Sequence, residues 1–135
     1  MFRVSKSVSF CYGHRLINYQ GKCRHLHGHN ARAVITLEST ALDERGMVED
    51  FSDLKQLVWS WLDQEIDHTM LLHKDDPILP VLLDAGERVQ ALAGNPTAEA
   101  IARMIYDYVA GKGYPVCEVT VWETETSRAS YSRER

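Results

Sequence analysis

The N-terminal segment alternates between apolar and polar residues. The even positions carry the apolar side chains Phe2, Val4, Val8 and Phe10, with Lys6 as the exception. Because successive side chains of a strand point to opposite faces, a period of two predicts a strand with one buried and one hydrated face. The odd positions from His27 to Leu37 repeat the pattern, which predicts a second strand over 27–38.

Between Asp50 and Asp67 the spacing becomes helical. Apolar residues recur every three or four positions, at Leu54, Leu57, Val58, Trp61, Leu62 and Ile66. This stripe predicts an amphipathic helix, with Asp50 as its N-cap. A second helix is expected from "NPTAEA", where Asn95 can cap and Pro96 suits the first helical position.

Two further strands are expected near the C-terminus. The segment "VCEVTVWE" (116–123) alternates again, and "ASYSRE" (129–134) predicts a shorter strand. The stretch Lys74–Gly94 contains two prolines and two glycines, and is expected to be a long connection with one short helical turn. The predicted order is strand, strand, helix, helix, strand, strand, in a single domain spanning 1–135.

Composition narrows the possible functions. A formal net charge of −4 argues against nucleic acid as the main partner, because phosphate binding needs clustered Lys and Arg. No apolar run has the length of a membrane span or the form of a signal peptide, so we expect a cytoplasmic protein. The odd number of cysteines does not resemble a disulfide framework and leaves at least one free thiol. Cys11 and Cys117 are expected to be small buried residues.

The segment "GKCRHLHGHN" (21–30) suggests a metal site. His27 and His29 share one strand face, and His14 joins them if the first two strands pair as a hairpin. Three imidazoles suit Zn²⁺ with an open fourth position. Spacing alone leaves the choice among His25, His27 and His29 open. It also leaves Cys23 either as a fourth ligand that closes a structural site or as a free thiol.

The same segment resembles a known family. The run from Cys23 to His29, "CRHLHGH", is similar to the cysteine and H-G-H pattern of the 6-pyruvoyltetrahydropterin synthase and 6-carboxytetrahydropterin synthase family. The short gap after Cys23 resembles the carboxytetrahydropterin branch, which serves queuosine synthesis. Five other segments follow in the family's order: "GHRL", "EDFSDLK", "IDHTMLL", "NPTAEAIA" and "WETETS".

The resemblance implies an α+β tunnelling fold, here expected as an antiparallel four-stranded sheet with two helices on one face in the order ββααββ. It also implies a homohexamer of two stacked trimers with active sites at subunit interfaces. Zinc would be held by His14, His27 and His29. The implied reaction converts 7,8-dihydroneopterin triphosphate to 6-carboxytetrahydropterin, with release of triphosphate and acetaldehyde. The alternatives are a 6-pyruvoyltetrahydropterin synthase or related pterin side-chain lyase, and a non-catalytic zinc-stabilised assembly module.

The resemblance also suggests roles for individual residues. Cys23 is the candidate base, since a thiol near a metal and a histidine can be deprotonated near neutral pH. Asp67 and His68 resemble the family's proton relay. Adjacent residues on a helix do not face one another, so this pair must lie at or beyond the helix end.

Substrate binding is expected to involve Glu123 and Thr124, which resemble the family's pterin anchor. Glu99 is either a partner of the helix dipole or a second contributor to the pterin pocket. The basic side chains near the site either meet the triphosphate or remain solvated: Arg15, Lys22, Arg24 and His25.

Overall fold

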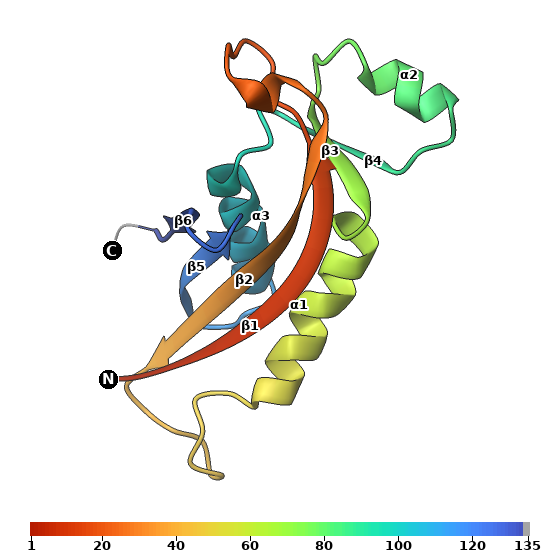
Figure 1. Ribbon diagram of the computed structural model, residues 1–135. Helices are drawn as coiled ribbons and strands as arrows, with labels where there is room; N and C mark the ends of the chain where they lie inside the picture. The colour runs from red at the N-terminus through yellow and green to blue at the C-terminus, as the bar shows by residue number, and fades with distance from the viewer. Residues whose placement is uncertain (134–135) are drawn as a thin grey trace.

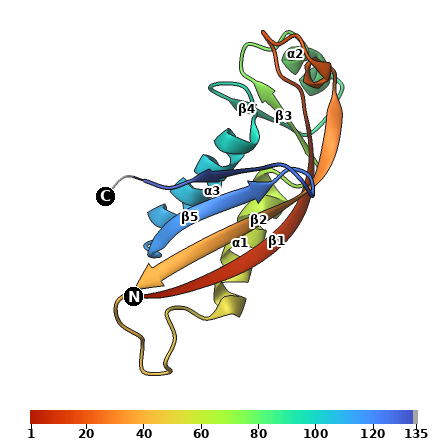
Figure 2. The same cartoon turned by 60° about the vertical axis from the view of Figure 1, so that its left-hand side comes forward.

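The computed structural model describes residues 1–133, which form one curled sheet with helices against it. The strands are β1 (Phe2–His14), β2 (His27–Ser39), β3 (Thr69–His73), β4 (Val89–Leu92), β5 (Val116–Trp122) and β6 (Arg128–Tyr131). The helices are α1 (Phe51–Glu65), α2 (Leu79–Asp84) and α3 (Ala98–Gly111), with a 3₁₀ turn, η1 (Lys22–Arg24), between β1 and β2. The longer helices α1 and α3 cover the same face of the sheet (Figure 1 and Figure 2).

The α+β class is confirmed, but the expected four-stranded antiparallel sheet and the order ββααββ are wrong. The sheet has six strands in the order β4-β3-β1-β2-β5-β6. It is mixed, because β3 runs parallel to both β1 and β4. The strands missed by the pattern are five and four residues long. In β3 the consecutive residues Leu71 and Leu72 are both buried, so no period of two marks the strand.

The β1–β2 hairpin follows the predicted alternation. The two strands pair along their whole length, from Phe2 opposite Ser39 to His14 opposite His27. The core-facing residues of β1 are the even positions Val8, Phe10, Tyr12 and His14, and those of β2 are the odd positions Ala31, Ala33, Ile35 and Leu37. One face of the hairpin is therefore apolar along most of its length and ends in histidines.

The helix starts were predicted with mixed success. Asp50 caps α1 as expected, because its side chain accepts a hydrogen bond from the Ser52 N–H. The cap of α3 is Thr97 rather than Asn95, since the Thr97 hydroxyl accepts from the Ala100 N–H. The Asn95 side chain instead accepts from the Ile17 N–H and donates to the Ile17 carbonyl. It thereby ties the start of α3 to the end of β1.

The connection from Lys74 to Gly94 is more ordered than expected, since it contains both α2 and β4. It is held to the end of β1 by an ion pair. The Arg15 guanidinium donates to both carboxylate oxygens of Asp76, whose side chain is fully buried. These hydrogen bonds lower the pKa of Asp76, and the Ile78 N–H donates to the same carboxylate.

The last predicted strand is present as β6, and Glu134, at the end of the predicted segment, lies outside the described residues. Across positions 1–133, no helix combines the length and the apolar character that crossing a bilayer requires.

We expect Asp76→Ala to lower the free energy of unfolding by about 3 kcal/mol, because it leaves the Arg15 guanidinium and the Ile78 N–H without their partner. Urea denaturation followed by circular dichroism measures this change. Asp107→Ala is the matched control, since it breaks exposed ion pairs with Arg103 and Arg133 and should change stability little. Equal effects of the two substitutions would contradict a structural role for the buried pair.

Candidate functional site

Three imidazoles converge at one end of the β1–β2 hairpin. His14 lies opposite His27, and His29 lies opposite Tyr12, so all three histidines point to the same face. The ring centroid of His14 is 4.5 Å from that of His27 and 5.0 Å from that of His29. One candidate ligand atom from each histidine and one from Glu123 lie within 4.8 Å of one another. The cluster is compact enough for a single metal ion.

Backbone carbonyls fix the orientation of two of the rings. His14 Nδ1 is 2.7 Å from the Pro96 carbonyl oxygen, and His27 Nδ1 is 2.7 Å from the His25 carbonyl oxygen. Each Nδ1–H therefore donates to a carbonyl, so Nε2 carries the lone pair that a metal would bind; His14 Nε2 lies 3.2 Å from His29 Nε2. His27 Nε2 is buried and has no hydrogen-bond partner among residues 1–133. This donor set and the unsatisfied nitrogen fit a zinc ion.

Glu123 belongs to the same cluster, which sequence reasoning missed. Its Oε1 lies 2.8 Å from His29 Nε2 and 3.9 Å from His14 Nε2. The relevant signal is the register between β2 and β5, in which Arg32 is opposite Trp122. That register carries the residue after Trp122 toward the start of β2, where His29 lies. The Glu123 carboxylate is therefore a possible fourth ligand as well as the expected pterin anchor.

The surroundings favour the uncharged form of two of the imidazoles, those of His14 and His29. Burial lowers the pKa of His14, although its hydrogen bond to the Pro96 carbonyl opposes the shift. Burial also lowers the pKa of His29, against the opposing charge of Glu123. Neutral imidazole is the form that binds a metal, so the site is prepared for one near neutral pH.

Asp67 and His68 lie just beyond α1, as their adjacency required. His68 has a φ of 54°, in the left-handed region that non-glycine residues rarely adopt. Here the His68 Nδ1 lies 2.7 Å from one carboxylate oxygen of Asp67. The other oxygen accepts the Cys11 N–H at 2.8 Å. Burial would raise the pKa of Asp67, but these hydrogen bonds outweigh it and lower the pKa below its usual value.

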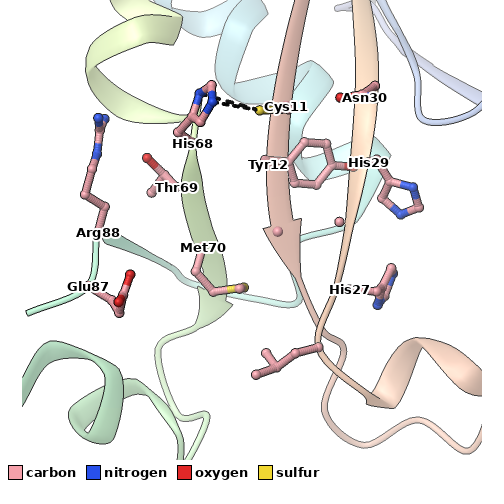
Figure 3. A pocket seen from close by; sticks show the side chains of 13 residues that line it. Cys11, Tyr12, His27, His29, Asn30, His68, Thr69, Met70, Glu87 and Arg88 are labelled. Atoms are coloured by element: carbon pink, nitrogen blue, oxygen red, sulfur yellow. Dashed lines mark hydrogen bonds between the residues drawn. The ribbon is translucent and has the colours of Figure 1, made fainter. Parts of the chain in front are cut away.

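The thiol beside His68 in this chain belongs to Cys11. The Cys11 Sγ lies 3.5 Å from His68 Nδ1 and 3.6 Å from His68 Nε2 (Figure 3). Cys11 and Cys117, expected to be small buried residues, are half-buried. Cys23 lies in η1, where its carbonyl accepts the Leu16 N–H. Its role as a base stays a prediction, and within one chain the partner of His68 is Cys11.

The Cys11–His68 pair and the imidazole cluster lie on opposite faces of the sheet. Cys11 is an odd position of β1, whereas Tyr12 and His14 are even positions that face the core. Figure 3 shows Cys11 and His68 between β1 and β3, while the rings of His27 and His29 project from β2 on the side away from β3. The two groups are therefore separate sites within one chain.

The other expected site residues are more exposed. Glu99 lies in the first turn of α3 and is exposed, and its two possible roles remain open. Thr124 is exposed in the β5–β6 turn, where its hydroxyl accepts the Ser127 N–H. Among the basic residues considered for the triphosphate, Arg15 is bound to Asp76, while Lys22 and Arg24 lie in η1. His25 contributes to the cluster through its carbonyl.

Comparisons with known proteins show the family to which the chain belongs. The family model described as "6-pyruvoyl tetrahydropterin synthase" matches residues 3–134. A 6-carboxy-5,6,7,8-tetrahydropterin synthase of Rickettsia bellii is 39% identical over 104 residues, covering 76% of this chain and 75% of the relative. One of Aquifex aeolicus is 32% identical, covering 98% of this chain and 99% of the relative. The crystal structure of an uncharacterized Wolinella succinogenes protein, 27% identical, superposes with a TM-score of 0.83 and covers 98% of both chains.

The lowered pKa values of His14 and His29 predict a pH-dependent stability. In the unfolded chain these histidines take up protons below about pH 6.5, whereas the folded state resists protonation. The unfolded state then binds more protons, so metal-free protein should lose stability as the pH falls from about 7.5 to 5.5. Urea midpoints measured with EDTA across this range test the prediction.

The carboxylates with lowered pKa, Asp67 and Asp76, lose their contribution only in a more acidic range, below about pH 4. Their effect is thus separable from that of the histidines. A His14→Gln variant removes one contributing group. Its urea midpoint, taken relative to its own value at pH 7.5, should therefore fall less steeply with decreasing pH. A slope unchanged from that of the original protein would count against the buried neutral imidazole.

Proposed function

Because the chain belongs to the 6-pyruvoyl tetrahydropterin synthase family, we propose that it is a zinc-dependent 6-carboxy-5,6,7,8-tetrahydropterin synthase. It would act as a carbon–oxygen and carbon–carbon lyase on 7,8-dihydroneopterin triphosphate, releasing triphosphate and acetaldehyde, in cytoplasmic queuosine synthesis. The relatives that carry this printed name, at 30–39% identity, support the choice of branch. The observation that carries the proposal is the convergence of three oriented imidazoles in a chain of this family.

His14, His27 and His29 are the proposed zinc ligands. Their nitrogens are close together, two rings are held by carbonyls, and burial keeps His14 and His29 neutral. A bound zinc ion would supply Lewis-acid polarisation, which acidifies positions next to the side-chain hydroxyls of a pterin substrate. The remaining work of binding and proton transfer falls to side chains of the protein.

Glu123 is the proposed pterin anchor, with Thr124 and Glu99 as further contributors. The 2.8 Å contact between His29 Nε2 and Glu123 Oε1 is favourable only with a proton on that nitrogen, whereas a metal ligand needs a bare lone pair. Glu123 therefore loses this donor in the metal-loaded protein. A half-buried carboxylate without a donor is suited to accept two N–H groups from a pterin ring.

Cys23 is the proposed base for the carbon-bound proton, and Asp67 and His68 form the proposed relay. The hydrogen bond to Asp67 orients the His68 ring, while 75% of the His68 side chain is exposed and available to a ligand or a neighbouring chain. A homohexamer with active sites at subunit interfaces would bring groups from different chains together. This is why Cys23 and His68 need not meet within one chain.

The product assay tests the proposal directly. Purified zinc-loaded protein incubated with 7,8-dihydroneopterin triphosphate should yield 6-carboxytetrahydropterin and acetaldehyde, identified by chromatography and mass spectrometry. Formation of 6-pyruvoyltetrahydropterin would instead place the chain in the other branch. The absence of any pterin product would overturn the enzymatic assignment.

Substitutions separate metal binding from chemistry. We expect Cys23→Ala to retain about one zinc per chain yet lose at least ~100-fold in turnover, because the base is absent while the ligands remain. His27→Ala should lose both metal and turnover. His73→Ala is the matched control, since His73 lies in β3 beside Asp75 and away from the cluster. Metal analysis, assembly state and turnover are measured together. Loss of zinc and assembly in Cys23→Ala would support a structural zinc module instead.

A further inference from the structure

The cluster of Cys11, His68 and Asp67 is a second group of reactive side chains, on the opposite face of β1 from the imidazole cluster. We propose that it is a thiol–imidazole–carboxylate triad in which Cys11 is an activated thiol, and that it is a modification site for small soft electrophiles, in particular hydrogen peroxide. The site is built entirely from one chain. It shares Asp67 and His68 with the proposed relay, but its thiol differs from the proposed base Cys23 and it is separate from the proposed metal centre.

The geometry has the three features of an activated nucleophile. The Cys11 Sγ lies 3.5–3.6 Å from the His68 ring nitrogens, within reach of proton transfer. The Asp67 carboxylate binds His68 Nδ1 at 2.7 Å, which leaves Nε2 to take the thiol proton. The second Asp67 oxygen accepts the Cys11 N–H, so one carboxylate positions both the imidazole and the backbone of the thiol residue.

The backbone makes this arrangement specific. The left-handed conformation of His68 places its ring against the carboxylate of the residue before it. The His68 N–H also donates to the Cys11 carbonyl, which holds the two segments side by side. Three hydrogen bonds therefore fix the arrangement. Two join Cys11 to Asp67 and His68 through the backbone of Cys11, and the third joins the His68 ring to the Asp67 carboxylate.

The triad opens into a cavity that admits a small reagent. Cys11, His68 and Met70 line a pocket of about 550 Å³ between β1, β2 and β3. Its floor includes the paired glycines Gly13 and Gly28, and Arg88 lies at its edge (Figure 3). His27 and His29 also line this pocket, although their rings lie on the side of β2 away from the Cys11 sulfur (Figure 3).

The chemistry with peroxide is balanced. The thiol proton passes to His68 Nε2, and the resulting thiolate attacks one oxygen of hydrogen peroxide. The oxygen–oxygen bond breaks, the sulfur is oxidised to a sulfenic acid, and the departing hydroxide takes the proton from His68 to form water. The peroxide is the oxidant and is reduced. The product places an S–OH group beside the His68 ring, where it competes with other proton donors and acceptors for hydrogen bonding to the imidazole.

This last consequence rests on the proposed function, because it matters only if His68 relays protons during turnover. Oxidation of Cys11 would then lower turnover through His68 without removing zinc. The reactivity of the thiol does not depend on that role and can be measured separately.

Alkylation rates test the triad. In zinc-loaded Cys23→Ala/Cys117→Ser protein, Cys11 is the sole thiol, and the intact mass after timed exposure to iodoacetamide gives its rate. The matched control is Cys11→Ser/Cys23→Ala, which leaves only Cys117. Burial raises the pKa of Cys117, and its Sγ donates to the Thr36 carbonyl. We expect Cys11 to react at least ~10-fold faster than Cys117.

Adding His68→Gln to the Cys11-only protein should slow alkylation by about 10-fold, because the proton acceptor is removed. The exposed His68 side chain makes this substitution compatible with folding. Asp67→Asn should slow the reaction as well, but Asp67 also holds the backbone, so His68→Gln is the deciding variant. Similar rates for Cys11 and Cys117, or a Cys11 rate unaffected by His68→Gln, would overturn the proposal.

Exposure of the Cys11-only protein to hydrogen peroxide, with dimedone as a trap, should add one dimedone per chain, and His68→Gln should reduce this adduct. Failure to form the adduct would overturn the assignment of peroxide as the reagent. These results are independent of the product assay. An inactive protein with a fast Cys11 would reject only the proposed function, whereas an active protein with a slow Cys11 would reject only the triad.

Discussion

The register of the β1–β2 hairpin is the constraint on which the imidazole cluster depends. His14 lies opposite His27 and Tyr12 lies opposite His29, so three rings from two strands share one face. A shift by one residue would send His27 and His29 to the other face, because the side-chain period of a strand is two. Gly28 permits the close approach of the strands here, since a Cβ at this position would lie 3.1 Å from the Tyr12 carbonyl oxygen.

The same alternation separates two kinds of chemistry. The even positions of β1 lead from the apolar core to His14, where burial favours neutral nitrogen ligands. The odd position Cys11 faces the other way and meets Asp67 and His68, which follow α1. A single strand thus supplies a candidate metal ligand to one face and a thiol to the other. Neither group requires the other for its geometry.

The sequence predicted the parts of the fold that depend on local periodicity. The alternation in β1 and β2, the apolar stripe of α1 and the cap at Asp50 all have their expected places. Strand β3 was missed because Leu71 and Leu72 are both buried in a parallel arrangement, which leaves no alternating pattern. Asn95 was taken for a cap because its side chain has the right chemistry, yet it bonds to Ile17, far away in the sequence.

The candidate functional site also divides into features set by local spacing and features set by long-range pairing. The grouping of His14 with His27 and His29 follows from strand spacing once the hairpin forms. The proximity of Glu123 depends on the β2–β5 register, and that of Cys11 to His68 depends on the placement of β3 beside β1. Both are long-range pairings that no local pattern encodes. Each places a chemically important side chain beside a partner many residues away.

The groups that orient the rings of His14 and His27 are main-chain oxygens, at Pro96 and His25. Every amino acid carries such an oxygen, so the orientation of these two rings does not depend on which side chains stand at positions 25 and 96. Relatives can therefore differ at positions 25 and 96 and keep the same imidazole tautomers, provided that the chain path is maintained. Variation at these positions would conceal a conserved interaction from any comparison of side chains alone.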